Sequence, residues 1–352
     1  MPSLNIIDAG AASIQGLGRY GSQRYGIAPG GAMDRMALAE ANALTGQPAG
    51  GAAIEIGPLP IRLGVSGGAV RIALSGADRE LLIDGRSVPL GATHVADKGV
   101  VVTVRGARNG QFSYLSVQGG LQGRDGQAPA ASNGFDISQS MRAWVLIAND
   151  WIAVKPAATG QQENRLRPQR RSASPIRVVL GPQLDYFSEE AVSRFLATPW
   201  AVSHASNRMA YLLEGGRVEL QKGFNIVSDG TVTGNIQIAG NGQPLAILRD
   251  RGTVGGYPKI ATIISADIGR FAQAPVAGRI TFEAVSVIEA QSIARDFAFA
   301  LANVKPRVET VQPFQPVSLA ALLDSNIAGD AFNPIDWLSE TNLSFVATRS
   351  SL

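Results

Sequence analysis

The apolar residues of this chain come in short runs, and this patterning restricts the fold more than any other feature. Glycine, which occurs 40 times in the 352 residues, and aspartate separate the runs. Short apolar runs bounded by turn-forming residues predict β-strands joined by tight turns. In the first half the runs lie at residues 61–65, 69–74, 81–83, 100–104, 112–117, 144–147 and 151–154. We therefore expect an antiparallel sheet or barrel there.

The amino-terminal segment adds a strand, a loop and a helix. An apolar strand at residues 4–7 leads into a glycine-rich loop over residues 10–31. Asp34 is placed to cap a helix that runs to about Leu44, and Gly46 stands where helices commonly end. Hairpin turns are predicted at two dipeptides, Asp84-Gly85 and Asn109-Gly110.

The second half repeats the short runs and adds two clear helices. Its predicted strands lie at residues 176–180, 211–213, 218–220, 235–238, 245–248, 260–264 and 279–284, with a hairpin signal at Asn241-Gly242. Ser188 caps a helix over residues 189–197, and Ser286 with Glu289 forms a capping box that opens a helix to about Asn303. The predicted fold class is mainly β with a few helices.

A polar, basic segment divides the chain. Residues 159–175 contain four arginines and almost no apolar residue, so we predict an exposed linker. A chain of this length suits two domains. We expect an amino-terminal β-rich domain over residues 1–158, a second domain over 176–304 and a carboxy-terminal extension over 305–352.

Composition argues against several functions. The net charge of +3 is small and partly concentrated in the linker, which speaks against a nucleic-acid-binding face. Without cysteine there is no disulfide, thiolate nucleophile or cysteine-bound zinc, and His94 and His204 are too isolated for a histidine metal site. We therefore expect no bound metal ion. The sequence shows neither a secretory signal nor a long apolar run, so we expect a cytoplasmic protein.

The densest group of polar residues lies between residues 203 and 270. The glycine loop, residues 252–256, lets the backbone approach a ligand closely, and the N–H groups of this loop can hold a carboxylate or phosphate oxygen. The candidates for substrate contacts are Asn207, Arg208, Gln237, Asp250, Arg251, Gly255, Gly256, Tyr257 and Lys259. An alternative interpretation is purely structural: a plain glycine-rich turn with a surface salt bridge after Asp250, an ordinary loop in which Asn207 makes a local turn, and an exposed polar strand face at Gln237. No general base is evident, so the catalytic residues stay unassigned.

Several segments resemble one family. QGLGRYG and GIAPGGAMD near the start, and SNRMAYLLEG, GNIQIAGNGQP and DRGTVGGYPKIATIISAD later, follow in order the pattern of the KipA family, or allophanate hydrolase subunit 2 domain. The resemblance covers residues from about 4 to 290. Its first pieces add a second candidate cluster, which consists of Gln15, Arg19 and Asp34.

This resemblance carries expectations about fold and partners. Such proteins are biotin-dependent carboxyltransferase-like, similar to half of the carboxyltransferase domain of urea carboxylase and to the C component of bacterial 5-oxoprolinase. It implies two β-rich domains, the second a cyclophilin-like barrel, and a cleft partly closed by a KipI-like B component. A LamB/YcsF-like A component or a biotin carboxylase would complete the enzyme. This chain alone would hold no cofactor, and ATP with the partner proteins, or carboxybiotin, would take part.

The resemblance implies a subunit of a multi-component, ATP-dependent amidohydrolase or carboxyltransferase that acts on a small amide or lactam. The first candidate for this substrate is 5-oxoproline, and the second is urea. Departures from the family pattern leave a second hypothesis open. Gly16 replaces an aspartate, Asp229 a glutamate, Gly252 a glutamine and Val254 a threonine. The alternative is a non-catalytic regulatory protein that sequesters a KipI-like kinase inhibitor.

Overall fold

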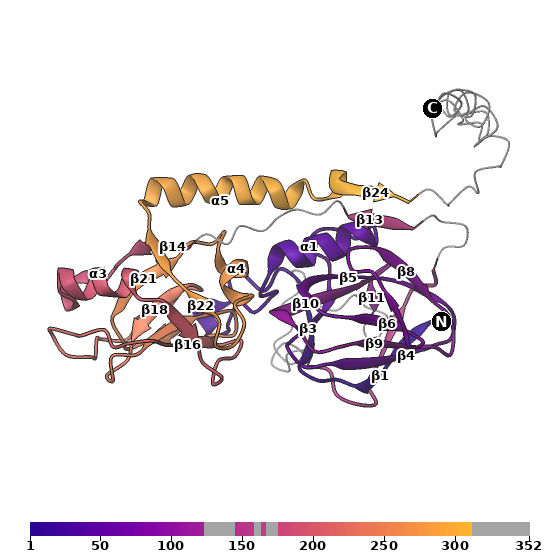
Figure 1. Ribbon diagram of the computed structural model, residues 1–352, viewed down its shortest axis with the longest axis horizontal. Coiled ribbons are helices and arrows are strands. Elements are labelled where there is room, and N and C mark those ends of the chain that lie inside the picture. The colour runs from indigo at the N-terminus through magenta and orange to yellow at the C-terminus, as the bar shows by residue number, and fades with distance from the viewer. Residues whose placement is uncertain (123–144, 158–162, 167–174, 312–352) are drawn as a thin grey trace, which may run out of the picture. The chain divides into compact units, whose positions relative to one another are not determined.

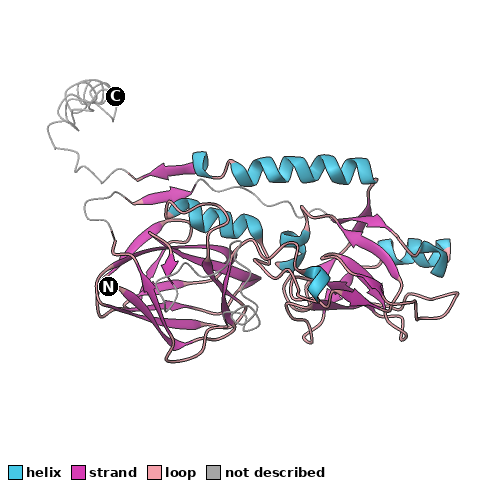
Figure 2. Ribbon diagram, turned by 180° about the vertical axis from the view of Figure 1, so that it is seen from behind, coloured by secondary structure: helices cyan, strands magenta, loops and turns pink. Residues whose placement is uncertain are grey.

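The computed structural model describes residues 1–122, 145–157, 163–166 and 175–311. One compact unit spans Met1–Val311, and a further segment, Gln312–Leu352, lies outside the described residues. Strands take up more of the described chain than the few helices between them (Figure 2). The predicted fold class is therefore confirmed.

Two sheets form the first half of the compact unit (Figure 1). The strands of the larger sheet are β1 (Ser3–Asp8), β4 (Ile61–Ser66), β6 (Leu81–Ile83), β7 (Arg86–Val88), β9 (Val101–Val104), β11 (Leu121–Gln122) and β12 (Trp151–Val154), in the order β11-β12-β1-β4-β9-β6-β7. Those of the smaller sheet are β2 (Ala12–Gln15), β3 (Ala53–Ile56), β5 (Val70–Asp78), β8 (Thr93–Ala96) and β10 (Asn109–Val117), in the order β2-β3-β10-β5-β8. Apolar side chains from both sheets, such as Leu4 and Ile72, form one core.

The second half forms a sheet that nearly closes on itself. Its strands are β14 (Ile176–Leu180), β15 (Trp200–Val202), β16 (Ala210–Glu214), β18 (Asn235–Ile238), β19 (Pro244–Ile247), β21 (Lys259–Ile263), β22 (Arg279–Ile280) and β23 (Phe282–Ala284), in the order β22-β15-β16-β19-β18-β21-β14-β23. The outermost strands, β22 and β23, are separated in the chain by Thr281 alone, so the sheet must curl until its edges approach. The barrel predicted for this half is confirmed.

Short ladders, helices and turns complete the described chain. The ladders pair β13 (Asn164–Leu166) with β24 (Val308–Thr310) and β17 (Asp229–Gly230) with β20 (Val254–Gly255). The α-helices are α1 (Arg35–Leu44), α3 (Glu189–Ala197), α4 (Ile268–Ala272) and α5 (Val287–Ala302). Asp34, Ser188 and the Ser286–Glu289 capping box begin α1, α3 and α5, which confirms the three predicted helix starts. None of the described helices has the length and apolar character needed to cross a membrane.

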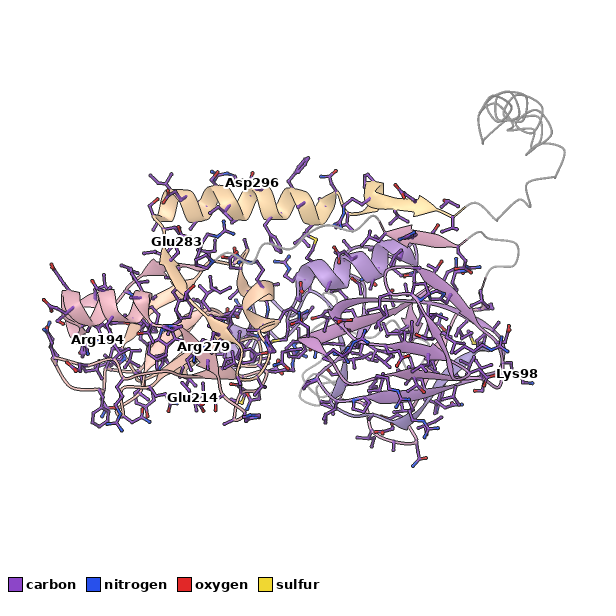
Figure 3. All side chains as sticks on the ribbon, viewed as in Figure 1. Lys98, Arg194, Glu214, Arg279, Glu283 and Asp296 are labelled. Atoms are coloured by element: carbon purple, nitrogen blue, oxygen red, sulfur yellow. The ribbon has the colours of Figure 1, made fainter. Side chains whose placement is uncertain are left out.

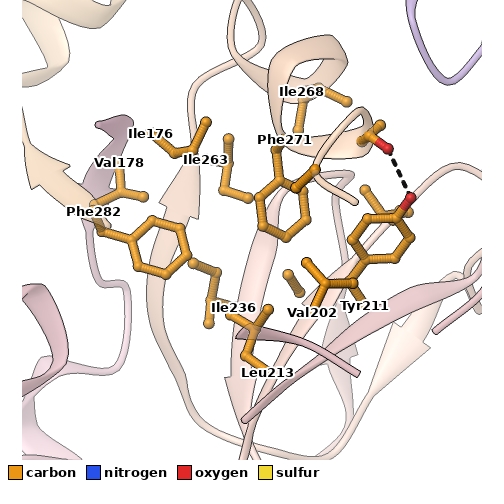
Figure 4. Close-up of a cluster of buried hydrophobic side chains, with 14 of the residues drawn as sticks. Ile176, Val178, Val202, Tyr211, Leu213, Ile236, Ile263, Ile268, Phe271 and Phe282 are labelled. Carbon is orange, nitrogen blue, oxygen red and sulfur yellow. Dashed lines mark hydrogen bonds between the residues drawn. The ribbon is translucent and has the colours of Figure 1, made fainter. Parts of the chain in front are cut away.

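Aliphatic and aromatic side chains together fill the barrel (Figure 4). The rings of Phe195 and Phe282 stack with their centroids 5.0 Å apart, and the Tyr211 hydroxyl donates to the carbonyl oxygen of Ala272 at 2.8 Å. The same core cluster includes Met33 and Phe112 of the first half. The two halves thus have separate sheets but share a core, and the predicted domain boundaries stay a prediction.

Three local predictions are wrong. Residues 218–220 form no strand, because the N–H of Val218 donates to Gly242 instead of to a neighbouring strand. Asn109-Gly110 is not a turn but the start of β10, where the register with β5 shifts. Part of the expected linker is strand β13, because Leu166 packs into a small core with Val304. Residues 158–162 and 167–174 of that region, and residue 144 of the run at 144–147, lie outside the described residues.

Candidate functional site

Arg208, in the loop before β16, lies at the centre of an ion-pair network. Its Nε and Nη2 donate to the two carboxylate oxygens of Asp250, at 2.7 and 3.1 Å. Its Nη1 pairs with Oε1 of Glu55, and Nη2 also donates to the carbonyl oxygen of Gly31 at 2.9 Å. Burial alone would lower the pKa of Arg208, but the carboxylates of Glu55 and Asp250 outweigh it and raise that pKa. Each nitrogen of the guanidinium is therefore bonded inside the protein.

Glu55, the network's acidic centre, was missed by the sequence reasoning. It is buried on β3, and its Oε2 accepts hydrogen bonds from the Tyr114 hydroxyl at 2.7 Å and from the Met33 N–H at 2.9 Å. Burial, followed by the charges of Glu55 and Asp34, raises the pKa of Tyr114 well above its usual value, so this hydroxyl stays a donor. An acidic residue between two isoleucines of a short apolar run was the available signal, because a buried charge needs a partner.

Two members of the second predicted cluster, Asp34 and Gln15, make hydrogen bonds that support the fold. Oδ1 of Asp34 caps α1 by accepting from Met36 and Ala37, and its Oδ2 accepts from Nε2 of Gln273 at 3.0 Å. Gln15 spans a loop, with its Oε1 accepting from the N–H of Gly31 at 3.2 Å.

The third member of that cluster, Arg19, lies beside the first group of candidates. A Cβ placed on Gly30 would come within 3.5 Å of Nη2 of Arg19 and 3.8 Å of Oδ1 of Asp250. The structure thus brings Arg19 next to the segment that carries Asp250 and Arg251, which lies some 230 residues further along the chain.

Gln237 and Lys259 form a second polar group inside the barrel wall. They are paired in register on β18 and β21, and both side chains are buried. Nζ of Lys259 donates to Oδ2 of Asp229 at 2.7 Å, which lowers the pKa of that carboxyl. Nε2 of Gln237 has no hydrogen-bond partner in the described part of the chain. A Cβ on Gly255 would lie 2.4 Å from that nitrogen, so glycine alone lets the loop pass this close.

The glycine loop itself is held by its carbonyl oxygens. Thr231 donates through Oγ1 to the carbonyl oxygen of Gly252 at 2.6 Å and through its N–H to that of Thr253 at 3.0 Å, and the carbonyl oxygen of Gly256 accepts from Ile226 at 2.9 Å. Tyr257 beside the loop is 37% exposed. These hydrogen bonds fix the backbone of the Gly252–Gly256 loop, which passes directly beside the side chain of Gln237.

Two further candidates, Asn207 and Arg251, differ in how far their side chains are exposed to solvent. Asn207 is exposed, and its Oδ1 accepts from the N–H groups of Met209 and Ala210, which is the local turn that the alternative interpretation predicted. Arg251 is buried, and so is Arg249, which the sequence reasoning missed. The available signal for Arg249 was its place in Arg-Asp-Arg directly after an apolar strand.

Two hollows of the surface lie away from these residues. One is lined by residues 217–220, 223–224 and 240–242 of the barrel, and the other by His94 and residues of the first half. Nε2 of His94 bonds the carbonyl oxygen of Pro89 at 2.8 Å. None of the predicted site residues lines either hollow, so the candidate site rests on the polar groups around Arg208, Gln237 and Lys259.

Comparison with known proteins defines the class to which this fold and these residues belong. A profile of the carboxyltransferase domain, subdomain A and B, matches residues 25–284. The C component of 5-oxoprolinase from Escherichia coli is 32% identical over 299 residues, which are 83% of this chain and 94% of that protein. The chain belongs to the carboxyltransferase domain family, and the predicted resemblance is confirmed.

Solved structures share the fold. The crystal structure of TTHA0988 superposes with a TM-score of 0.68 at 27% identity, over 80% of this chain and 55% of that one. Urea amidolyase of Kluyveromyces lactis gives a TM-score of 0.74 at 21% identity, over 86% of this chain and 20% of that one. The chain thus spans about half the length of TTHA0988 and a fifth of the amidolyase.

Proposed function

We propose that this chain is the counterpart of the 5-oxoprolinase C component in a multi-component, ATP-dependent amidohydrolase of the cytoplasm, with 5-oxoproline as its substrate and urea as the next candidate. The observation that carries the proposal is the nearly complete match with a protein of that kind. The chain corresponds to 94% of the length of the E. coli C component. A correspondence that spans nearly the whole of a dedicated component favours the same place in a similar assembly.

The polar group inside the barrel wall suits an amide or lactam. Hydrolysis of such a bond places negative charge on the carbonyl oxygen, and donors aimed at that oxygen stabilise the charge. Gln237 offers a buried Nε2 without a partner in the described chain, and Lys259 lies beside it on the next strand. We assign these two side chains to the carbonyl group. We assign no residue to the activation of the attacking water or to the protonation of the leaving nitrogen.

Partner proteins complete the proposal. The sequence has no glycine-rich P-loop ending in Lys-Ser or Lys-Thr, so we assign ATP to a KipI-like B component and a LamB/YcsF-like A component. A urea-type reaction would instead use a biotin carboxylase and carboxybiotin. Contacts to either set of partners remain part of the proposal.

Co-expression with the two partners tests it. We expect ADP, inorganic phosphate and glutamate to form from ATP, 5-oxoproline and two water molecules only when all three components are present. Lys259→Met should lower the turnover about 100-fold, the usual effect of losing one oxyanion donor. Lys222→Met is the matched control, because Lys222 is exposed and pairs with the exposed Asp185.

Other outcomes would redirect the assignment. Turnover of urea with a biotin carboxylase would move the chain to the carboxylation reaction. A stable complex with the KipI-like protein that turns over neither substrate, but relieves its inhibition of a kinase, would support the regulatory alternative.

A further inference from the structure

Two buried arginines, Arg249 and Arg251, flank Asp250 in the segment that follows β19. Arg249 is 7% exposed and Arg251 is 4% exposed. No carboxylate of the described residues pairs with either one: Nη1 of Arg249 reaches the Tyr20 hydroxyl at 3.5 Å, and Nη1 of Arg251 reaches the carbonyl oxygen of Gly252 at 3.4 Å. Both contacts are long, and Nε of each arginine is buried without a partner in the described chain.

This arrangement is costly for the folded protein. Burial, and then the neighbouring charge of Arg249, lower the pKa of Arg251. Arg79, which is buried as deeply, shows how the fold satisfies a structural arginine: its Nη2 donates to the carbonyl oxygens of Gly57 and Gln111 at 3.0 Å each, and its Nε lacks a partner among the described residues. Arg249 and Arg251 have no such pair of short contacts within the described chain. Their donors are held in place and left for another group.

The surroundings add further elements of a binding site. The loop that contains Tyr20 packs against this segment, since the N–H of Gly30 donates to the carbonyl oxygen of Arg249 at 3.1 Å. It also brings the guanidinium of Arg19 close to Gly30. On the other side, the Gly252–Gly256 loop runs from Arg251 to Nε2 of Gln237, which has no partner among the described residues. The arginines and the proposed carbonyl-binding group therefore border the same loop.

We propose that Arg249 and Arg251 bind a small oxyanion, and that in the proposed reaction this anion is the carboxylate of the substrate. Guanidinium groups offer paired donors that match the two oxygens of a carboxylate or the oxygens of a phosphate. The assignment deepens the proposed function and rests on it only for the identity of the anion. It favours 5-oxoproline over urea, because urea carries no carboxylate.

Calorimetric titration of the full chain at low ionic strength provides the test. The three ligands are 5-oxoproline, the unsubstituted lactam pyrrolidone and inorganic phosphate. We expect 5-oxoproline to bind more tightly than pyrrolidone, which lacks the carboxylate. Arg249→Met and Arg251→Met should each weaken binding roughly 10- to 100-fold, as expected for one charge-assisted hydrogen bond. Arg217→Met, which removes an exposed arginine of the barrel, should bind as the wild type does.

Thermal unfolding without ligand separates a binding role from a structural one. Removing one of two buried like charges should leave the melting temperature unchanged or raise it, whereas Arg79→Met should lower it. If a methionine variant does not fold, Arg249→Lys and Arg251→Lys keep the charge but lose the paired donors, and the same loss of binding is expected.

The outcomes distinguish the two proposals. Binding of 5-oxoproline that depends on both arginines supports both of them. Binding of phosphate alone, with the same dependence, supports the oxyanion site and counts against the lactam substrate. Equal affinity of the variants and the wild type, or no binding of either anion, overturns the oxyanion site and leaves the proposed function to its own test.

Discussion

Within the second half of the chain, the guanidinium of Arg208 faces two carboxylates, whereas those of Arg249 and Arg251 face none among the described residues. All three arginines lie around Asp250, and among the described residues its carboxylate accepts side-chain hydrogen bonds only from Arg208. A charge taken out of water needs compensation, because its lost hydration is otherwise unreplaced. The compensated arginine therefore stabilises the fold, and the pair without a carboxylate among the described residues is the one we propose to bind a ligand.

Charged residues at the surface give the reference for this comparison. The side chains of Lys98 and Asp296 lie at the outside of the structure (Figure 3), where water provides the compensation. Exposed ion pairs contribute little to stability for the same reason. What distinguishes Arg208 from Arg249 is thus the internal partner, and substitutions that remove internal partners should show it.

The largest effect is expected for Arg208→Met. It leaves Glu55 as a buried carboxylate without its cation, and breaking a buried pair in this way costs about 3–5 kcal/mol. Chemical denaturation should report this loss in the free energy of unfolding. Arg194→Met, which removes an exposed partner of Glu219, is the control and should change it little. Adding Glu55→Gln to Arg208→Met should restore part of the loss, and a double variant as unstable as the single one would argue against the pairing.

Local structure followed from the sequence wherever one short-range signal decided it. Asp34 caps α1 and Asp84-Gly85 joins β6 to β7, because side-chain caps and positive φ angles act within a few residues. Asn109-Gly110 carries the same signal but starts β10, since Asn109 pairs with Asp78 of β5 before the register between the two strands shifts. A turn dipeptide predicts a turn only when no longer-range pairing overrides it.

The candidate site was only partly predictable for a related reason. Gln237 and Lys259 were both named as candidate substrate contacts, and the register of β18 with β21 brings them together. Glu55 and Arg208 are 153 positions apart, and nothing in either local sequence indicates the other. The sequence also could not distinguish an arginine with partners from one without, because the partners are chosen by the tertiary fold.

A smaller effect is expected for Asp267, where the signs are reversed and arginines compensate a buried carboxylate. Its oxygens accept from Nε and Nη2 of Arg177 at 2.9 and 2.7 Å, and Arg270 lies 3.1 Å away. Burial would raise the pKa of Asp267, but the hydrogen bonds from Arg177 outweigh it and the pKa is lowered. The stabilisation is therefore present above the unfolded-state pKa and is lost as the pH falls through the folded-state pKa.

Asp267→Asn should lower the free energy of unfolding at pH 7 by about 1.5–3 kcal/mol, the loss expected for charge-assisted hydrogen bonds. The wild type should lose this advantage from about pH 5 downward, so the two unfolding curves should converge in acid. Asp296→Asn, an exposed aspartate of α5, serves as the control. Parallel curves for the wild type and Asp267→Asn over the whole pH range would contradict the assignment.

The smallest effect is expected for Asp229→Asn. The carboxylate of Asp229 is compensated partly by the buried Lys259 and partly by water. The side chain of Lys259 is 2% exposed and that of Asp229 is 54% exposed. Lys259 lowers the pKa of Asp229, so the pair stabilises the fold above the unfolded-state pKa of an aspartate and stops doing so in acid. At neutral pH the melting temperature of Asp229→Asn should fall only slightly, close to the change for Asp185→Asn in the exposed pair with Lys222. Asp229→Glu, which restores the usual family residue, should retain the pair. A fall as large as that of Arg208→Met would show that Lys259 depends on this carboxylate alone, and Lys259 would then belong with the structural charges rather than with the site.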